Sequence, residues 1–239
     1  MNSNELTVGV LGGMGPEATI GFMSRVIALT PAERDQDHIH MIVEHNPKVP
    51  NRQAAIRREG ADAGPELAAM ALRLEKAGAD FLVMPCNSAH AFLEPIQNAT
   101  SVPLVSIIAE SIEEINRVCP EARHVGVMAT DGMLEAGIYQ NALFEADRVP
   151  VVPRDDELAG LMTFIHRIKA GDKGRDVSEG VGMLAELLAS AGAGVIIAAC
   201  TEIPLVLNAG NISVPVISST DVLARRTVEI ARRGNPVSV

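Results

Sequence analysis

The sequence predicts an α/β protein with two similar, doubly wound parallel-sheet domains. Three observations support this prediction. Apolar runs of strand length alternate with longer segments of helical spacing, and part of the chain is repeated. The composition is 47% hydrophobic but only 3% aromatic, without Trp, which suits aliphatic strands covered by Ala/Leu helices. Strands that alternate with helices form right-handed βαβ units and hence parallel sheets.

The repeat is clearest around two cysteines. Residues 77–87 and 191–201 each read as a turn, a buried apolar run, a cysteine and a small polar residue, and they lie 114 positions apart. Residues 8–11 with 125–128, and 101–103 with 213–215, fall near the same offset. Duplicated halves commonly meet across a pseudo-twofold axis. We therefore expect domains at 1–109 and 110–217, with a last helix, 218–239, that packs back on the first domain.

Each element is assigned from its apolar spacing. The expected strands are Leu6 to Leu11, Met41 to Val43, Phe81 to Met84, Leu104 to Ile107, Val125 to Met128, Val149 to Val152, Val195 to Ala199 and Val214 to Ile217. The expected helices are Pro16 to Leu29, Gln53 to Ala77, Ser88 to Ala99, Ala109 to Val118, Gly132 to Glu145, Leu158 to Ala170, Val177 to Ala191 and Asp221 to Arg233.

Length and charge narrow the class of protein. The 239 residues suffice for two domains of about 110 residues each. A net charge of −10 disfavours nucleic-acid and acidic-membrane partners, and no apolar run is long enough to span a bilayer. The N-terminus lacks a basic region followed by an apolar one. We expect a soluble cytoplasmic protein.

Two of the three cysteines stand out by position. An odd number without close pairing predicts reduced thiols, and Cys119 ends a helical segment just before Pro120, where a structural role is sufficient. Cys86 and Cys200 instead follow apolar strands, at the sheet edge where α/β proteins bind ligands. Buried cysteine is a common core residue, but two at equivalent positions of a repeat favour function.

The surroundings of these cysteines favour reactivity. Each is expected to begin a helix, whose amide groups and dipole would lower the thiol pKa. His90 lies four residues after Cys86 and Glu202 two after Cys200, so either could orient a thiol or share its proton. The alternative is that His90 packs locally and that Glu202 neutralises backbone N–H groups.

Opposed thiols suit one class of reaction. Inverting a carbon that bears hydrogen requires removal of a proton from one face and delivery to the other. A thiolate and a thiol of similar acidity can exchange these roles near neutral pH.

Three motifs carry a resemblance to a known family. They are residues 12–19 after the first strand, residues 84–90 around Cys86, and residues 199–204 around Cys200. With them the chain resembles, over nearly its whole length, the aspartate/glutamate racemases that are independent of pyridoxal phosphate. The resemblance implies two α/β domains with the active site in a cleft between them, racemisation of acidic amino acids without cofactor or metal, and a homodimer.

The resemblance also implies roles for single residues. Cys86 and Cys200 become the catalytic acid and base, and His90 and Glu202, singled out above by their positions, would support them. The substrate contacts carry over to Met14, Arg52, Gln53, Asn87, Ser88, Thr130, Lys169 and Thr201. Arg52 and Lys169 would be the cationic partners of the substrate carboxylates, since Arg grips a carboxylate with two parallel bonds and Lys supplies a point charge.

The chain departs from the family pattern near the substrate. Asn-Thr-Ala-His is common where this chain has Ser88, Pro-Asp-Arg-Thr where it has Asn51 and Gln53, and Gly-Thr where it has Gly132 and Met133. These departures do not include the two cysteines. They leave open aspartate, glutamate or another amino acid as substrate.

Other readings remain. The glycine loop 13–18 fits a dinucleotide fingerprint, with Glu44 as its acidic residue. Cys86, His90 and Cys200 could ligate zinc, and His38, His40 and His45 cluster in the sequence, although close metal-ligand spacing is missing. A cis-trans isomerase, a decarboxylase or a non-catalytic amino-acid binding protein could use the same frame.

Overall fold

The structure is a computed structural model that describes residues 5–233. The chain forms two compact units. Within the described residues, the first unit comprises 5–107 and 220–233, and the second comprises 108–219. The ends of the predicted first domain (1–4) and of the predicted last helix (234–239) lie outside the described residues.

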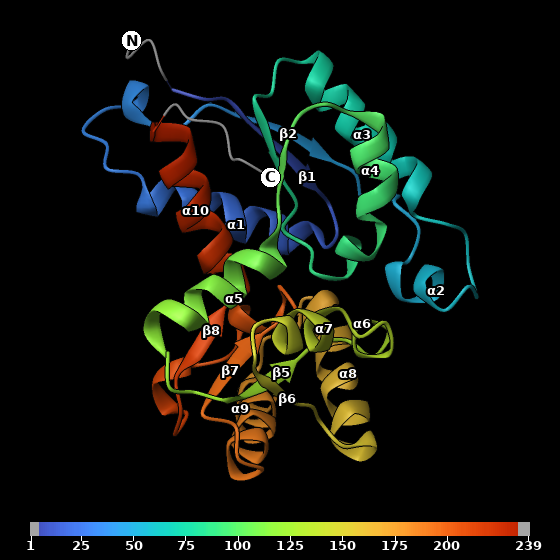
Figure 1. The fold of residues 1–239 in the computed structure, drawn as a ribbon, viewed down its shortest axis with the longest axis vertical. Coiled ribbons are helices and arrows are strands. Elements are labelled where there is room, and N and C mark those ends of the chain that lie inside the picture. Colours follow the sequence, from blue (N-terminus) through green and yellow to red (C-terminus); the bar gives the residue numbers. More distant parts are fainter. Residues whose placement is uncertain (1–4, 234–239) are drawn as a thin grey trace. The chain divides into compact units, whose positions relative to one another are not determined.

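The first unit is built on a parallel sheet in the order β2-β1-β3-β4 (Figure 1). Its strands are β1 (Val8–Gly12), β2 (Met41–His45), β3 (Phe81–Val83) and β4 (Leu104–Val105). Helices α3 and α4 lie on one side of the sheet, and α1 and α10 lie on the other (Figure 1). The helices are α1 (Pro16–Leu29), η1 (Asp35–Asp37), α2 (Arg52–Ile56), α3 (Gly64–Lys76), η2 (Ser88–Phe92), α4 (Leu93–Ala99) and α10 (Ser219–Arg233).

The second unit repeats this architecture with the strand order β6-β5-β7-β8. Its strands are β5 (His124–Met128), β6 (Val149–Val151), β7 (Val195–Ala198) and β8 (Val216–Ser218). Its helices are α5 (Ile107–Val118), α6 (Asp131–Glu135), α7 (Ile138–Glu145), α8 (Asp155–Lys169), α9 (Arg175–Ser190), η3 (Ile203–Leu205) and η4 (Ala209–Asn211). The predicted α/β class with two parallel sheets is therefore confirmed.

The two units share details as well as topology. A Cβ on Gly9 would lie 2.7 Å from Leu82 Cδ2, and a Cβ on Gly126 would lie 2.9 Å from Ile196 Cγ1. In both units a glycine is thus required where the first strand packs against the third. Glu75 accepts hydrogen bonds from the backbone N–H and hydroxyl of Ser101, and Glu186 accepts the same two bonds from Ser213.

The helix that follows the last strand of each sheet belongs to the other unit. Helix α5 follows β4 but packs in the second unit, where Tyr139 Oη lies 3.4 Å from Ser111 Oγ. Helix α10 follows β8 but completes the first unit. There Asp221 pairs with Arg25 of α1 at 3.0 Å, and the Leu6 N–H donates to the Ala231 carbonyl oxygen at 2.9 Å.

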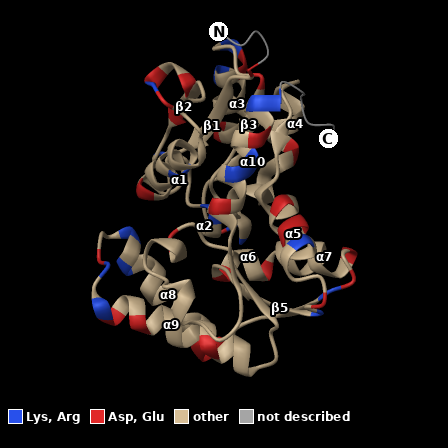
Figure 2. Cartoon of the chain, turned by 90° about the vertical axis from the view of Figure 1, so that its left-hand side faces the viewer, with Lys and Arg blue, Asp and Glu red and all other residues tan. Residues whose placement is uncertain are grey.

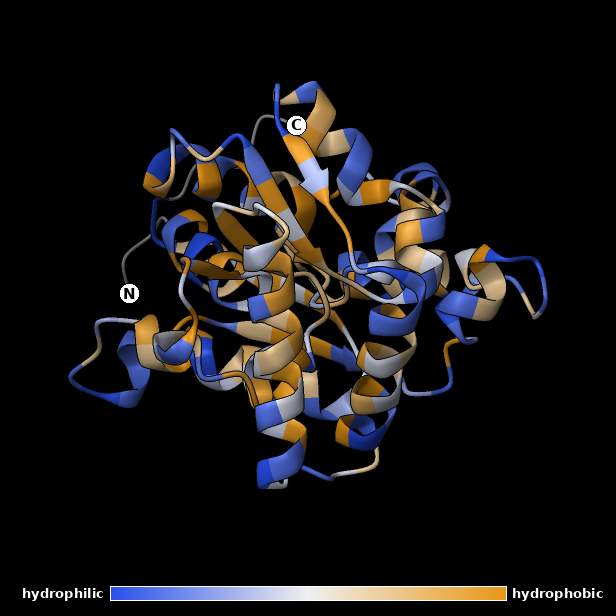
Figure 3. Ribbon diagram, turned by 90° about the horizontal axis from the view of Figure 1, so that it is seen from below, coloured by the Kyte–Doolittle hydropathy of each residue, from blue (hydrophilic) through white to orange (hydrophobic). Residues whose placement is uncertain are grey.

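Burial follows the period of each element. Strands β1, β3 and β7 are buried throughout, and Figure 2 shows β1, β3 and β5 without Lys, Arg, Asp or Glu. The helices are amphipathic and alternate hydrophobic and hydrophilic bands (Figure 3). Between residues 5 and 233, no helix is long and apolar enough to cross a membrane.

Three predicted helices are broken in the structure. The expected helix over 53–77 is divided into α2 and α3, because Arg58 has a left-handed φ of 59° and Pro65 starts a new helix. The expected helix over 132–145 is divided at Gly137, whose φ is 66°. The helix expected over 88–99 begins as the 3₁₀ segment η2.

Candidate active site

Cys86 lies in a tight loop between β3 and η2. The thiol-bearing residue is 6% exposed and belongs to the hydrophobic cluster that includes Leu11, Met14 and Ala89. Its backbone N–H donates to the Met84 carbonyl oxygen at 2.7 Å, which fixes the loop. Cys86 is followed by a 3₁₀ turn rather than the expected α-helix. The sulfur therefore lacks the long helix dipole that the sequence suggested.

His90 holds the Cys86 loop through its two ring nitrogens. Nδ1 lies 3.0 Å from the Cys86 carbonyl oxygen, and the Ile107 N–H donates to Nε2 at 3.2 Å. An N–H donor at Nε2 and a carbonyl at Nδ1 define one neutral tautomer, with its proton on Nδ1. Burial lowers the His90 pKa from 6.5 to about 4. Both ring nitrogens of His90 therefore contact backbone groups, and neither contacts the Cys86 thiol.

Two predicted substrate contacts, Arg52 and Gln53, begin helix α2 next to this loop. Asn51 caps the helix by accepting from the N–H groups of Gln53 and Ala54. Arg52 Nη1 donates to the carbonyl oxygens of Val49 and Pro50 at 2.9 and 2.8 Å. In the described part of the first unit, no carboxylate pairs with this guanidinium. The side chain is thus oriented by backbone carbonyl oxygens rather than by an ion pair within this unit.

Gln53 connects α2 to the Cys86 loop. Its Nε2 donates to Ser88 Oγ at 2.9 Å, while its Oε1 is buried with no hydrogen-bond partner in the described chain. Both residues occupy positions at which this chain departs from the family pattern. The structure brings these two departures into direct contact.

The glycine loop before α1 is fixed by a residue that the sequence analysis did not single out. Thr19 accepts from the Gly13 N–H at 2.8 Å and donates to the Gly15 carbonyl oxygen at 3.1 Å, while its methyl group blocks any side chain at Gly12. Met14 lies buried in this loop. A threonine one turn into a helix that begins with glycines is the signal that could have identified it.

Cys200 has a different neighbourhood in the second unit. Its thiol donates to Glu202 Oε2 at 3.0 Å, and both residues are buried, 6% and 4% exposed. The Thr201 hydroxyl lies 3.5 Å from the same oxygen. The carbonyl that precedes the loop, on Ala198, accepts a bond from Ser219 Oγ at 2.9 Å. The sequence gives no signal for this role of Ser219 beyond its place after a strand.

Lys169 forms an ion pair with Glu202, the residue that accepts from the Cys200 thiol. Its Nζ lies 3.7 Å from Glu202 Oε1, at the end of helix α8. Burial raises the pKa of the Cys200 thiol well above 9, the Glu202 carboxylate raises it further, and Lys169 offsets part of this rise. The prediction that the loop lowers the thiol pKa is therefore wrong for Cys200, because desolvation outweighs the short turn that follows it.

The predicted site residues are divided between the two units. Met14, Arg52, Gln53, Cys86, Asn87, Ser88 and His90 belong to the first, and Thr130, Lys169, Cys200, Thr201 and Glu202 to the second. Direct hydrogen bonds or ion pairs join Gln53 to Ser88 and Glu202 to its three neighbours. Thr130 is buried at the start of α6, and Asn87 is buried beside Cys86.

Known proteins share this fold and sequence. The family model for Asp/Glu/hydantoin racemases matches residues 11–227. The chain belongs to this racemase family. It is 32% identical, over 92% of its length, to the broad specificity amino-acid racemase RacX of Bacillus subtilis (strain 168), of which it covers 96%. The prediction of a racemase-family enzyme is confirmed, and the enzyme class is that of an isomerase.

Solved racemase structures agree with this assignment. Picrophilus torridus aspartate racemase superposes with a TM-score of 0.81 at 25% identity, covering 95% of this chain and 94% of that one. An aspartate racemase homologue from Pyrococcus horikoshii OT3 superposes with a TM-score of 0.76 at 26% identity, covering 95% and 99%. Glutamate racemase from Francisella tularensis, at 16% identity and a TM-score of 0.66, shares the fold over 96% of this chain and 82% of that one.

The residues that suggested a dinucleotide site or a zinc site have other partners in the structure. In a dinucleotide site the Gly13 N–H would face phosphate and Glu44 a ribose, but Thr19 accepts from that N–H and Arg73 pairs with Glu44 at 3.0 Å. Both ring nitrogens of His90 are engaged by backbone groups, so this residue cannot ligate zinc in its present position. No group of three metal-binding side chains forms among residues 5–233.

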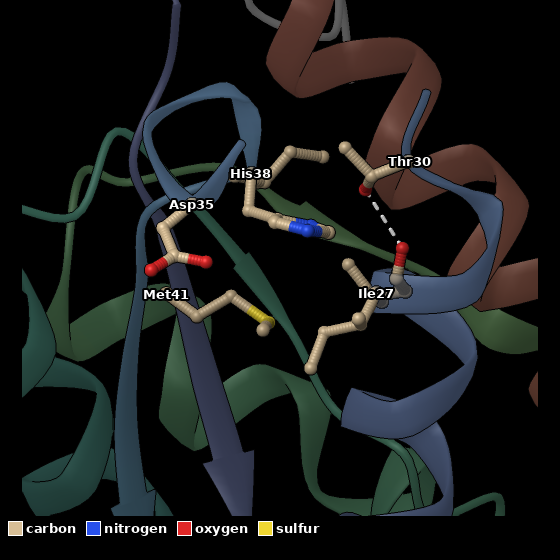
Figure 4. Close-up of a pocket in the computed structure, with 7 residues that line it drawn as sticks. Ile27, Thr30, Asp35, His38 and Met41 are labelled. Carbon is tan, nitrogen blue, oxygen red and sulfur yellow. Dashed lines mark hydrogen bonds between the residues drawn. The ribbon is translucent and has the colours of Figure 1, made fainter. Parts of the chain in front are cut away.

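The racemase also has a cavity away from the predicted residues. It measures about 410 Å³ and lies between the end of α1 and the start of β2 (Figure 4). Ile27, Thr30, Asp35, His38 and Met41 surround it, and the Thr30 hydroxyl donates to the Val26 carbonyl oxygen at 2.7 Å. None of the predicted site residues lines this cavity.

Proposed function

We propose that this chain interconverts the L and D forms of an acidic amino acid, aspartate or glutamate, by moving the α-proton between two thiols, Cys86 and Cys200, without a cofactor. The observation that carries the proposal is the pair of equivalent buried cysteines, each after the third strand of a repeated parallel sheet, in a chain of the racemase family. One thiolate removes the α-proton from one face while the other thiol delivers a proton to the opposite face.

Arg52 is the proposed anchor for a substrate carboxylate. Support comes from its two bonds to backbone carbonyl oxygens, which restrict the side chain before any ligand binds. A guanidinium near the α-carboxylate also stabilises the charge that develops when the α-proton leaves. Asn87, Thr130 and Thr201 supply further hydrogen-bonding groups, and Met14 supplies an apolar wall.

Gln53 and Ser88 are the proposed contacts that determine specificity for the substrate side chain. An amide and a hydroxyl can each donate or accept, so turning the Gln53 amide by 180° keeps a hydrogen bond to Ser88. In one orientation the amide oxygen is available to the substrate, and in the other the amide NH₂ group is available. The pair can therefore receive a carboxylate or a donor-bearing side chain. The broad specificity in the name of the Bacillus subtilis relative supports a tolerance of this kind.

Deuterium oxide provides the direct test of the proposed function. Panels of L- and D-amino acids would be incubated with the enzyme and analysed for mass and chirality. We expect α-deuterium incorporation with inversion for aspartate or glutamate, lost as racemisation in Cys86→Ala and in Cys200→Ala, while Cys119→Ala remains active. Full inversion by either single cysteine variant would contradict the two-thiol mechanism.

The proposal also includes the homodimer that the resemblance implies and the cytoplasmic location expected from the sequence. Sedimentation velocity of the purified chain tests the first, and cell fractionation tests the second. A monomer at all protein concentrations would remove the dimer from the proposal and leave the chemistry unaffected.

A further inference from the structure

The cavity between α1 and β2 in the first unit has apolar walls and a small set of polar groups (Figure 4). Ile27 and Met41 are among its apolar side chains, and Thr30, Asp35 and His38 are its polar ones. Among the described residues, no lysine or arginine belongs to this lining. A volume of about 410 Å³ falls within the range of small-molecule sites, which is about 300–1,000 Å³. The size and the mixed lining are therefore those of a ligand site.

The loop over residues 31–38, which forms one side of the cavity, is held in place by helix α10. Arg232 Nη2 donates to the carbonyl oxygen of Pro31 and, at 3.0 Å, to that of Asp37. Within the loop, the His38 N–H donates to the Asp35 carbonyl oxygen at 3.2 Å and ends the short helix η1. The backbone that carries the polar side chains is thus fixed before any ligand binds, which limits the entropy lost on binding.

The polar groups of the cavity can all accept hydrogen bonds. His38 Nδ1 is buried and has no hydrogen-bond partner in the described chain, and it is an acceptor when the neutral ring carries its proton on Nε2. Among residues 5–233 the Asp35 carboxylate forms no ion pair, and the neighbouring Arg34 pairs with Asp37 instead, at 3.0 Å. The Thr30 hydroxyl gives its proton to a backbone carbonyl oxygen and keeps lone pairs that can accept.

We propose that this cavity binds a small primary amine, with the ammonium group at Asp35 and His38 and the hydrocarbon stem against Ile27 and Met41. An ammonium group has three donors and no acceptor, which matches a lining that offers acceptors and no cation. The stem gains affinity by leaving water for the apolar walls. The site goes beyond the proposed racemisation and does not depend on it.

Charge separates this ligand class from the proposed substrates. A carboxylate in the cavity would lie near Asp35 and would find no cationic partner in the lining, so it should be repelled. A neutral alcohol with the same stem would keep the apolar contact and lose the charge-assisted hydrogen bonds. Amine, alcohol and acid with one common stem therefore distinguish selective binding of an amine from unselective filling of an apolar cavity.

Titration with hexylamine, 1-hexanol and hexanoate provides the test, since all three have a six-carbon chain. The full-length protein would carry ¹³C in its methionine methyl groups, and a Met41→Leu variant would identify the Met41 resonance in the NMR spectrum. We expect hexylamine to shift the Met41 signal with a Kd of about 1 mM. Binding of 1-hexanol should be about tenfold weaker, and hexanoate should not saturate the signal.

Three variants alter the proposed contacts at positions that tolerate substitution. Asp35 is exposed and Ile27 is 49% exposed, so changes there should leave the fold intact, which thermal unfolding checks. Asp35→Asn should weaken hexylamine binding about fivefold, and His38→Phe about threefold. Ile27→Arg brings a cation to the lining and should weaken hexylamine binding by about tenfold or more.

Matched controls make the same changes in charge away from the cavity. Asp155→Asn removes an exposed carboxylate of the second unit, and Ser24→Arg adds a cation at an exposed position of α1 outside the lining. Both should leave the Kd for hexylamine within twofold of the wild type. An equal loss of affinity in a control and in its matched variant would mean that net charge, and not this cavity, attracts the amine.

Several results would overturn the proposal. They are equal affinity for hexylamine and 1-hexanol, tighter binding of hexanoate, a Met41 signal that hexylamine does not move, and an unchanged Kd in Asp35→Asn. Racemisation is not a readout in this titration. Failure of the amine site would therefore leave the proposed reaction in place, and loss of the proposed reaction would leave the amine site in place.

Discussion

The Nδ1 atom of His90 lies 3.0 Å from the carbonyl oxygen of Cys86, and the opposite ring nitrogen accepts from the Ile107 N–H. One buried imidazole thus ties the loop that bears a candidate catalytic thiol to Ile107, which also belongs to the first unit. A protonated ring would lose the second bond, because both nitrogens would then be donors. The loop geometry therefore depends on His90 staying neutral.

Because of His90, the free energy of unfolding should decrease as the pH is lowered. His90 has a folded pKa of about 4 against 6.5 in an exposed ring, so below 6.5 the unfolded chain binds a proton that the folded chain excludes. The stability lost between pH 6.5 and pH 4 should reach about 3 kcal/mol. Urea unfolding across this range measures it. His90→Gln should flatten the slope, whereas the exposed His166→Gln should keep it.

The activity of a His90 variant should identify a positioning role. His90→Gln should lower kcat by roughly tenfold or more, since misplacement of a reacting group is costly, while the pH dependence of kcat/KM keeps its wild-type midpoints. Steady-state racemisation assays across pH would show this. A midpoint that disappears with His90 would mean that the ring takes part in proton transfer.

Gln53 should control tolerance for the substrate side chain. Gln53→Glu replaces a group that donates or accepts by one that only accepts and is negative, so it should repel acidic substrates. We expect the ratio of kcat/KM for aspartate to that for asparagine to fall by about tenfold or more, as for a like charge at close range. Gln97→Glu, an exposed site on α4, adds the same charge and should leave the ratio unchanged.

The two equivalent glycines should respond alike to substitution. Gly9→Ala and Gly126→Ala each place a Cβ within 3.0 Å of a packed side chain, and each should cost about 1–3 kcal/mol of unfolding free energy. Gly9 should be the more sensitive, because it meets both Leu82 and Ala79 below 3.0 Å. Gly160→Ala on α8 meets nothing within 4 Å and should stabilise by up to about 1 kcal/mol. Equal stability of all three would argue against the packing seen here.

Enantiomers have equal free energy, so kcat/KM must be the same in both directions whatever the thiols do. The different neighbours of the two thiols, a carboxylate at Cys200 and only a backbone contact from His90 at Cys86, should instead appear in kcat and KM, which change together, and in different pH dependences of kcat from the L and D sides. Glu202→Gln should reduce that difference. Progress curves started from each pure enantiomer provide the measurement, and identical kcat profiles in the wild type would count against the asymmetry.

The sheets and cysteine positions were predictable because they rest on local patterns. Strands that are buried along their whole length have continuous apolar sequences. A polar residue after such a run indicates the carboxyl edge of the sheet, as at Cys86 and Cys200. The breaks at Arg58 and Gly137 depend on single left-handed residues, which apolar spacing does not reveal.

Contacts between distant residues were not predictable from the sequence. Lys169 reaches Glu202 across 33 positions, and Gln53 reaches Ser88 across 35, so neither pair has a periodic signal. The effect on thiol acidity was misjudged for a related reason. Burial of Cys200 depends on packing by elements far along the chain, and no motif states how much water is excluded.

The completion of the first unit by α10 has a consequence for biosynthesis. The N–H of Leu6, at the entry to the first sheet, donates to the carbonyl oxygen of Ala231, so the start of this sheet needs a partner that lies 225 positions further along the chain. Residues 108–219 form a unit that is complete in sequence before the rest of helix α10 is made. The second unit can then mature first, while the first unit, whose strands are translated earlier, waits for helix α10, which reverses the usual vectorial order.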